Sequence, residues 1–463
     1  MTAENIKNKP LLPLFIKGEV SQRFFNLLSN GIGFINSYFI ITYLSVYQFG
    51  LYQLVLSFIS ILSTFDLDLF DGVISVDMRR HFNTGKDGLA KRLFREAVFL
   101  RIGIALVLVA IVFLLSGVIS DHYGSDISLF VKIASFLLII KAFQSVLDIF
   151  FQAVLSFSIY SLALIREFIK LFFIVGLVLL NSLTITSVIA CAVITEFLAL
   201  VFFSSFFFVK KYRNTFGKIK MGNEDYGHPV KNILKDYGAI FLVRYSVSRI
   251  LKNMNPWIVK FFLNVEAVAF YVLAVNLISF ANSLIPMVGI QSVLALKADE
   301  RENMGHIVKR AIKYTFWIGL VFLFGAIFIV PYIAALIFPK YVSAMPVFKV
   351  MAIALPLFGA FKVLKSSLFV LREQRILTQR LFNELFITLV CSVIFLPTIG
   401  VIGMGVIHVL VYSERVYFMY TRLVRAHSEF KMKIAYLFSF DKYDRDFFQR
   451  TSRTILSTIK KSS

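Results

Sequence analysis

The sequence has few charged residues, few acids and almost no cysteine. Only 16% of its 463 residues are charged, whereas soluble domains have about a quarter. The 27 acids are outnumbered by 49 bases. The two cysteines, Cys191 and Cys391, lie far apart in the sequence, which argues against a disulfide framework and against a metal site. We predict no metal and no other cofactor.

Motifs for nucleotide, peptide or ester chemistry are also missing. The chain contains no G-x-x-x-x-G-K-[ST], no H-E-x-x-H and no G-x-S-x-G, so ATP hydrolysis and hydrolase chemistry have no support. The N-terminus lacks an apolar stretch followed by a small-residue cleavage site, and we expect no removable signal peptide. We predict that the chain is not an enzyme.

Long apolar runs dominate what is present. Hydrophobic residues make up 58% of the chain, and a bilayer is crossed by about 20 apolar residues in a helix. The sequence therefore predicts an all-α polytopic membrane protein of about twelve spans. These spans are 21–46, 50–75, 95–119, 128–153, 156–180, 184–208, 236–262, 266–292, 309–337, 343–370, 377–398 and 400–424.

The connections between these spans alternate in charge. One set is basic, for example around Arg79 and Lys91, around Lys210 and around Arg375, whereas Lys340 is the only base in the other set. Because basic loops stay on the cytoplasmic side, both termini are predicted to be cytoplasmic. This rule accounts for most of the net charge of +22, so we do not predict nucleic acid as a partner.

A long polar loop divides the chain into two halves of six spans each. A faint repeat supports the division, because FGLYQLVLSFIS at 49–60 resembles VAFYVLAVNLIS at 268–279. An even number of spans per half implies a parallel repeat. The predicted domains are an N-terminal bundle, 1–208, a cytoplasmic linker, 209–235, a C-terminal bundle, 236–424, and a basic tail, 425–463. The tail is expected to form an amphipathic helix on anionic lipid.

Three stretches resemble the polysaccharide flippases of the multidrug/oligosaccharidyl-lipid/polysaccharide (MOP) superfamily. They are YQFGLYQLVLSFISIL, DLFDGVISVDMRRHF and NVEAVAFYVLAVNL. The resemblance implies two six-helix bundles around a central cavity in the plasma (inner) membrane. It also implies that a polyprenyl-diphosphate-linked oligosaccharide moves from the inner to the outer leaflet. Expected partners are this lipid-linked oligosaccharide and membrane lipids, and the resemblance leaves room for a polysaccharide polymerase.

The seventh predicted span carries a basic stripe. Arg249, Lys252, Asn253 and Lys260 fall within about 100° of one another on a helix. Each base at mid-depth costs about 2.5–3.5 kcal/mol on insertion scales, so the stripe should face water or an anion. A diphosphate headgroup is one such anion. The alternative is pairing with a carboxylate on another helix, such as Glu196 or Asp148.

Further bases and acids lie within the predicted spans. Arg101 and Arg166 are expected to extend toward the membrane surface. Three acids in FDLDLFDG, Asp66, Asp68 and Asp71, are expected near the inner surface, paired with Arg23 or Arg79 or serving a coupling cation. The candidate diphosphate ligands are Arg249, Lys252, Lys260, Arg244, Arg23, Lys141, Lys362 and Lys365, and the candidates for ion coupling are Glu196, Asp148 and Asp68.

Two other functions compete with the flippase. A cation-coupled drug or small-molecule antiporter of the same superfamily would be expected to have an acid-rich cavity, whereas the spans here contain more bases. A polytopic sugar polymerase would be expected to carry catalytic acids in a sizeable external loop, and the external loops here are short. The sequence does not name the glycan.

Overall fold

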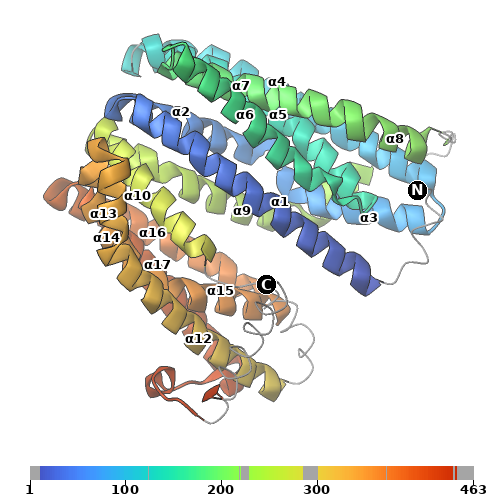
Figure 1. Cartoon of the computed structure of the whole chain (residues 1–463). Coiled ribbons are helices and arrows are strands. Elements are labelled where there is room, and N and C mark those ends of the chain that lie inside the picture. Colours follow the sequence, from blue (N-terminus) through green and yellow to red (C-terminus); the bar gives the residue numbers. More distant parts are fainter. Residues whose placement is uncertain are drawn as a thin grey trace, which may run out of the picture. The chain divides into compact units, whose positions relative to one another are not determined.

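The computed structural model describes residues 11–123, 125–217, 219, 229–284, 301–371, 373–441, 444 and 445. These residues are almost all helical and contain no strand, which confirms the predicted all-α fold. The chain divides into two compact units (Figure 1). Unit 1 comprises Met1–Leu273 and Phe338–Ser343, and unit 2 comprises Ala274–Ile337 and Ala344–Ser463.

Unit 1 is a bundle in which α5 has a central position, packed against α2, α3, α4 and α7. Helix α9 packs against α2 and α4 and so belongs to unit 1, although the sequence places it in the second half. The division predicted at 209–235 stays a prediction. The helices of unit 1 are α1 Leu11–Tyr43, α2 Val46–Leu62, α3 Asp71–Asn83, α4 Asp87–Tyr123, α5 Ser125–Ala153, α6 Ser161–Leu179, α7 Ile185–Phe203, α8 Val209–Phe216, α9 Pro229–Phe262 and the first part of α10 Val265–Leu284.

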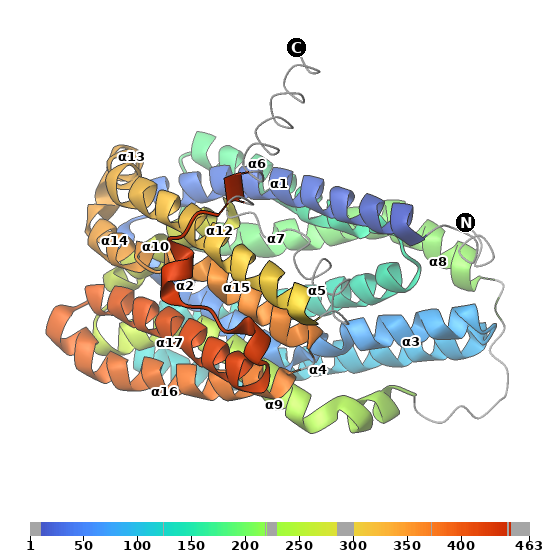
Figure 2. The ribbon, with the colours of Figure 1, turned by 90° about the horizontal axis from the view of Figure 1, so that it is seen from below.

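Unit 2 is built around α15, which packs against α12, α16 and α17. Figure 2 shows α16 and α17 running side by side, as their contacts require. Its helices are α12 Arg301–Phe328, α13 Val330–Ile337, α14 Met345–Ala352, α15 Leu355–Val370, α16 Gln374–Ile399 and α17 Ile402–Ala426.

Each of the twelve predicted spans is mostly helical over the described residues, although the span 50–75 breaks between α2 and α3. Eight helices, or nine if the bent pair α14–α15 is one span, are long and apolar enough to cross a membrane. This count covers the described residues, and it does not confirm twelve. Helices α6, α9 and α17 fall short because charged side chains interrupt them, such as Arg166, Glu167 and Lys170 in α6. The interrupted helices are therefore where polar function is expected.

Local sequence accounts for the start of α2 and for its close contact with the start of α10. Ser45 accepts a hydrogen bond from the backbone N–H of Gln48, whose side chain accepts one from Ser45, and this capping box begins the helix. Gly50 lies against the carbonyl oxygen of Val265, which a Cβ atom would approach to 2.1 Å. Glycine is therefore required where α2 meets the start of α10.

The chain after α17 forms a C-terminal segment, residues 427–441 with Asp444, that packs on α12. This part of the tail contains short 3₁₀ turns at Ser428–Phe430 and Ile434–Leu437 rather than the expected amphipathic helix. Residues 442, 443 and 446–463 of the tail lie outside the described residues, so there the expectation stays a prediction. Phe430 is buried in the core of unit 2. The indole of Trp317 donates to the carbonyl of Leu437 at 2.8 Å. The difference arises because the aromatic residues of this segment find a protein surface to cover.

Lys313 and Asp444 form a fully buried ion pair beneath this segment. The hydroxyl of Tyr314 donates to the same carboxylate at 2.6 Å. Burial raises the pKa of Asp444, but hydrogen bonds from Lys313, Tyr314 and the backbone N–H of Asp441 outweigh it and lower this pKa to about 2. Asp444 therefore stays ionised at physiological pH.

We expect Tyr314→Phe to loosen the C-terminal segment. The change removes one hydrogen bond to a charged group, which contributes about 1.5–3 kcal/mol. The apparent melting temperature in detergent should fall, and limited proteolysis should cut faster within 427–441. Tyr332→Phe is the control, because Tyr332 is exposed on α13. Equal effects of the two substitutions would contradict the role given to Tyr314.

Candidate functional site

The candidate site is built on a break in the helix between α2 and α3. Short 3₁₀ turns cover Ser63–Asp66 and Asp68–Phe70, and Leu67 between them has a left-handed backbone with φ of 59°. A helix that breaks leaves backbone carbonyls without intrahelical donors. Two arginines supply donors here: Arg101 Nη2 to Leu67 O at 2.8 Å, and Arg249 Nη1 to Ser63 O at 3.4 Å.

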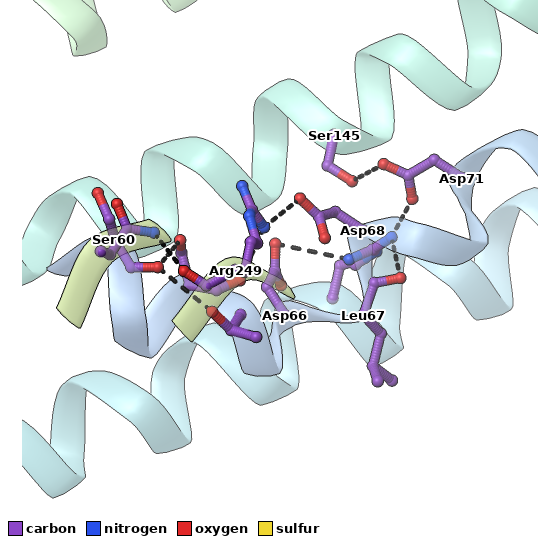
Figure 3. A network of polar contacts seen from close by, with 11 residues as sticks. Ser60, Asp66, Leu67, Asp68, Asp71, Ser145 and Arg249 are labelled. Atoms are coloured by element: carbon purple, nitrogen blue, oxygen red, sulfur yellow. Dashed lines mark hydrogen bonds and ion pairs between the residues drawn. The ribbon is translucent and has the colours of Figure 1, made fainter. Parts of the chain in front are cut away.

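One side of the break is a buried cluster around Arg101. Its partners Asp66, Leu67 and Asp71 are labelled in Figure 3. The guanidinium forms ion pairs with Asp71 and, at 3.5 Å, with Asp66. Ser145 on α5 donates to Asp71 at 2.6 Å. Only 2% of the Arg101 side chain is exposed, so the prediction that it extends toward the membrane surface is wrong. Two carboxylates and the backbone carbonyl of Leu67 hold it inside the bundle.

The other side of the break is the Arg249–Asp68 pair. Arg249 Nη1 lies 2.5 Å from Asp68 Oδ2. The Cζ atom of Arg249 lies 5.4 Å from the centre of the Tyr245 ring. About 34% of the Arg249 side chain and 26% of the Asp68 side chain are exposed. The carboxylate that pairs with Arg249 is thus Asp68, not Glu196 or Asp148. The sequence predicted Arg249 at mid-membrane and Asp68 near the inner surface, and their contact means that both depths cannot hold.

A second polar network joins α1, α5, α6 and α7. Arg166 forms ion pairs with Glu167 at 3.2 Å and with Glu196 at 3.3 Å. Asn36 donates to Glu167 at 2.9 Å, and Gln144 donates to Glu196 at 2.7 Å. Arg166 is therefore held by acids inside the bundle, although about a third of its side chain is exposed.

Lys141 on α5 connects the two regions electrostatically. It is within range of Glu196 and Arg166 on one side, and of Arg249 and Asp68 on the other. Asp148 is near Asp71 and forms no ion pair with any residue that the structure describes. Unit 1 therefore brings together Arg249, Lys141, Asp68, Glu196 and Asp148 from the predicted set.

The other predicted residues lie apart from this group or outside the description. Lys252 is exposed and has no ion pair within the described residues, and Lys260 is half-buried near the end of α9. Lys362 donates to the carbonyl of Asn282 at 3.3 Å, and Lys365 is exposed beside Phe369. Both of these lysines belong to unit 2. The side chains of Arg23 and Arg244 lie outside the described residues.

The arrangement combines two kinds of arginine in one helix bundle. Arg101 is sealed among its partners and fixes the helix break. Arg249 and Arg166 are paired, but about a third of each side chain is exposed, so an incoming anion could compete for them. Charged side chains that face the inside of a membrane bundle and pair with one another are typical of a polar path through it.

The family model described as polysaccharide biosynthesis protein matches residues 17–294. The chain belongs to this family. No curated protein matches the chain.

The fold of this polysaccharide biosynthesis protein is found in solved MOP-superfamily transporters. The lipid II flippase MurJ in an inward closed conformation matches with a TM-score of 0.72 at 14% identity, over 90% of this chain and 89% of MurJ. An inward-facing multidrug resistance MATE family transporter gives 0.67 at 15% identity, over 89% and 96%. A MOP superfamily transporter from Pyrococcus furiosus, with a binding pocket of reverse polarity, gives 0.54 at 14%, over 91% and 95%.

These matches confirm the predicted superfamily and the multi-pass membrane fold. They are to transporters and flippases rather than enzymes, in agreement with the prediction that this family member is not an enzyme. Sequence identities near 14% show only that the fold is shared. The substrate therefore has to be inferred from the residues of this chain.

Sequence analysis missed a polar cluster in unit 2 of this family member. Glu384 accepts hydrogen bonds from Arg380 at 2.9 Å and from Arg415 Nε at 3.1 Å. The Arg415 guanidinium also lies over the Tyr412 ring, 4.4 Å from its centre. The charge pattern of the connections groups Arg380 with the basic, cytoplasmic set around Arg375. The spacing of four residues between Arg380 and Glu384 was the available signal.

Proposed function

We propose that the protein moves a polyprenyl-diphosphate-linked oligosaccharide from the inner to the outer leaflet of the plasma membrane. It would do so by alternating access, with both termini in the cytoplasm. The observation that carries the proposal is the Arg249–Asp68 pair, an ion pair at a helix break that is about one-third exposed on the arginine side. The headgroup diphosphate would take the place of Asp68 on Arg249.

The chemistry of the pair favours such an exchange. A guanidinium binds phosphate oxygens through two parallel hydrogen bonds, as it does a carboxylate. A diphosphate carries more charge than the single carboxylate of Asp68. Lys252 lies three residues from Arg249 on the same helix and is exposed, so it could bind a second phosphate oxygen. Lys141 adds a positive charge near this pair.

The remaining predicted ligands extend the same proposal. Lys260, Arg244 and Arg23 would contact the headgroup at other stages of its passage. Lys362 and Lys365 are the proposed ligands that belong to unit 2. Movement of a diphosphate outward is favoured by an inside-negative potential, at about 2.3 kcal/mol per charge for each 100 mV. Asp68, Glu196 and Asp148 are the proposed positions for a coupling ion. A polymerase partner is a further proposal.

A cation-coupled antiporter is the second candidate, and one observation favours it. The polar residues of unit 1 include Asp148, an acid inside the bundle that forms no ion pair with described residues. An acid of this kind suits a proton or metal cation. Arg249 is nevertheless the more exposed partner of the pair, at 34% against 26% for Asp68, and Lys252 beside it is also basic, so an anionic substrate is favoured.

Native mass spectrometry of the purified protein tests the proposal. The wild type should retain a polyprenyl-diphosphate oligosaccharide and not the free polyprenol, and Arg249→Ala/Lys252→Ala should lose this selectivity. Lys210→Ala/Arg213→Ala is the matched control, because it removes one lysine and one arginine that are exposed on α8. Similar binding by wild type and the Arg249/Lys252 variant, or no binding by either, would favour the antiporter.

A further inference from the structure

A second site of unit 1 lies away from the helix break. It is a groove with a cavity of about 460 Å³, within the range of small-ligand sites. Helix α5 contributes Phe143, Val146 and Leu147. One wall is α4, and the other is the end of α7 with α8 (Figure 1). The spacings of three and four residues show that each helix presents one continuous face to the groove.

The second wall depends on an unusual turn in the chain. Residues Ser204–Phe208 form a π-helical turn between α7 and α8, which adds a residue to the turn and shifts the helix face. Leu200, Ser204, Phe208 and Tyr212 all line the groove as a result. The ring of Phe216 on α8 stacks on Phe94 of α4 at 5.9 Å. This contact holds α8 across the end of the groove.

The groove is apolar along its length and basic at one end. Its lining is aromatic and aliphatic except for Ser204, Tyr212 and two bases of α4, Lys91 and Arg95. Lys91 donates to the carbonyls of Phe216 and Ile219 at 3.2 and 2.9 Å. It therefore ties α8 to α4 and keeps its charge at the groove.

Arg95 is the second base of this end of the groove. Its side chain is exposed, and its Cζ lies 5.5 Å from the centre of the exposed Phe99 ring. The nearby acid Glu96 pairs with Arg92 at 3.3 Å and accepts from the backbone N–H of Val230. None of these three residues lines the groove, whose charged lining residues are Lys91 and Arg95.

We propose that this groove binds an anionic phospholipid of the cytoplasmic leaflet. The headgroup phosphate would lie at Arg95 and Lys91, and one acyl chain would lie along Phe143, Val146 and Leu147. A phospholipid fits because its polar and apolar ends match the two ends of the groove. Basic pockets between membrane helices on the cytoplasmic side bind anionic headgroups in this way.

The orientation of the helices agrees with this occupant. Lys91 and Arg95 lie in the first turns of α4, and Tyr212 lies in α8, next to the segments that the charge pattern assigns to the cytoplasm. None of the residues that line the groove belongs to the Arg249–Asp68 pair or to the Arg166 network. The inference is therefore independent of the proposed transport substrate.

Lipid retention by native mass spectrometry tests the site. Phosphatidylglycerol and phosphatidylcholine would be compared on the wild type, Arg95→Gln, Arg95→Lys and Val98→Trp, since Val98 lines the groove. A base near a membrane surface contributes about 1 kcal/mol, so Arg95→Gln should weaken phosphatidylglycerol binding about fivefold. Arg95→Lys should restore most of it. Val98→Trp should remove both lipids by filling the groove.

The control is Arg80→Gln, because Arg80 is exposed on α3 outside the groove. A photoreactive phosphatidylglycerol should label peptides containing 143–147 or 200–208. Equal retention by wild type and Arg95→Gln, or an equal loss in Arg80→Gln, would overturn the proposal. Displacement of the lipid by millimolar inorganic phosphate alone would assign the basic end to a free anion and would also overturn it.

Discussion

Arg249→Ala is expected to reduce outward movement of a fluorescent polyprenyl diphosphate about 30- to 100-fold in proteoliposomes. The guanidinium would bind the headgroup by charge-assisted hydrogen bonds, and losing them costs about 2–3 kcal/mol. Folding should change little, because partly exposed ion pairs contribute about 0.2–1 kcal/mol and about a third of Arg249 is exposed. Arg249→Lys should be intermediate, since it keeps charge but loses the two-point geometry.

Asp68 gives the discriminating variant for this prediction. If the Arg249–Asp68 pair were only structural, Asp68→Ala/Arg249→Ala would recover what either single change loses. If Arg249 binds the headgroup, the double variant stays inactive, while Asp68→Ala alone keeps binding because the competitor of the phosphate is gone. Full transport in the double variant would therefore contradict the assignment of Arg249.

Arg101→Ala is expected to destabilise the protein by about 3–5 kcal/mol, the cost of breaking a buried ion pair from one side. The change leaves Asp66 and Asp71 without their cation, and it removes the donor to the carbonyl of Leu67. The apparent melting temperature in detergent and the yield of monodisperse protein should both fall. Arg101→Met/Asp66→Asn/Asp71→Asn should recover part of the loss, because no buried charge is then left unpaired.

Arg166→Ala is the matched control for Arg101. Arg166 also pairs with two carboxylates, but about a third of its side chain is exposed against 2% for Arg101. Water can therefore take over part of its role toward Glu167 and Glu196. A loss of stability in Arg166→Ala as large as in Arg101→Ala would show that exposure does not separate the two arginines.

The fold was predictable because it depends on properties that lie along the chain. Apolar runs give the helices, and the alternating charge of the loops orders them. The count of spans is less certain for a physical reason. Charges such as Arg166 and Lys170 interrupt α6. The helix is therefore less apolar than an ordinary membrane span, although the bundle accommodates it.

The site was predictable only in part. The basic stripe of α9 pointed to Arg249, because an unpaired base is costly in hydrocarbon. Its partner Asp68 was not predictable, since their contact depends on the left-handed backbone at Leu67. Leucine gives no local signal for that conformation, unlike glycine. The same break explains why Arg101 turns inward, where sequence alone suggested a route to the membrane surface.

The pairing of Lys313 with Asp444 has a consequence for the order of biosynthesis. The two residues are 131 positions apart, and the ribosome adds about 5–20 residues per second. About 7–26 s therefore pass between the synthesis of Lys313 in α12 and the synthesis of Asp444, which supplies its carboxylate partner. During that interval unit 2 holds an uncompensated lysine, so a nascent chain stalled before Asp444 should be the form that a membrane chaperone or protease recognises.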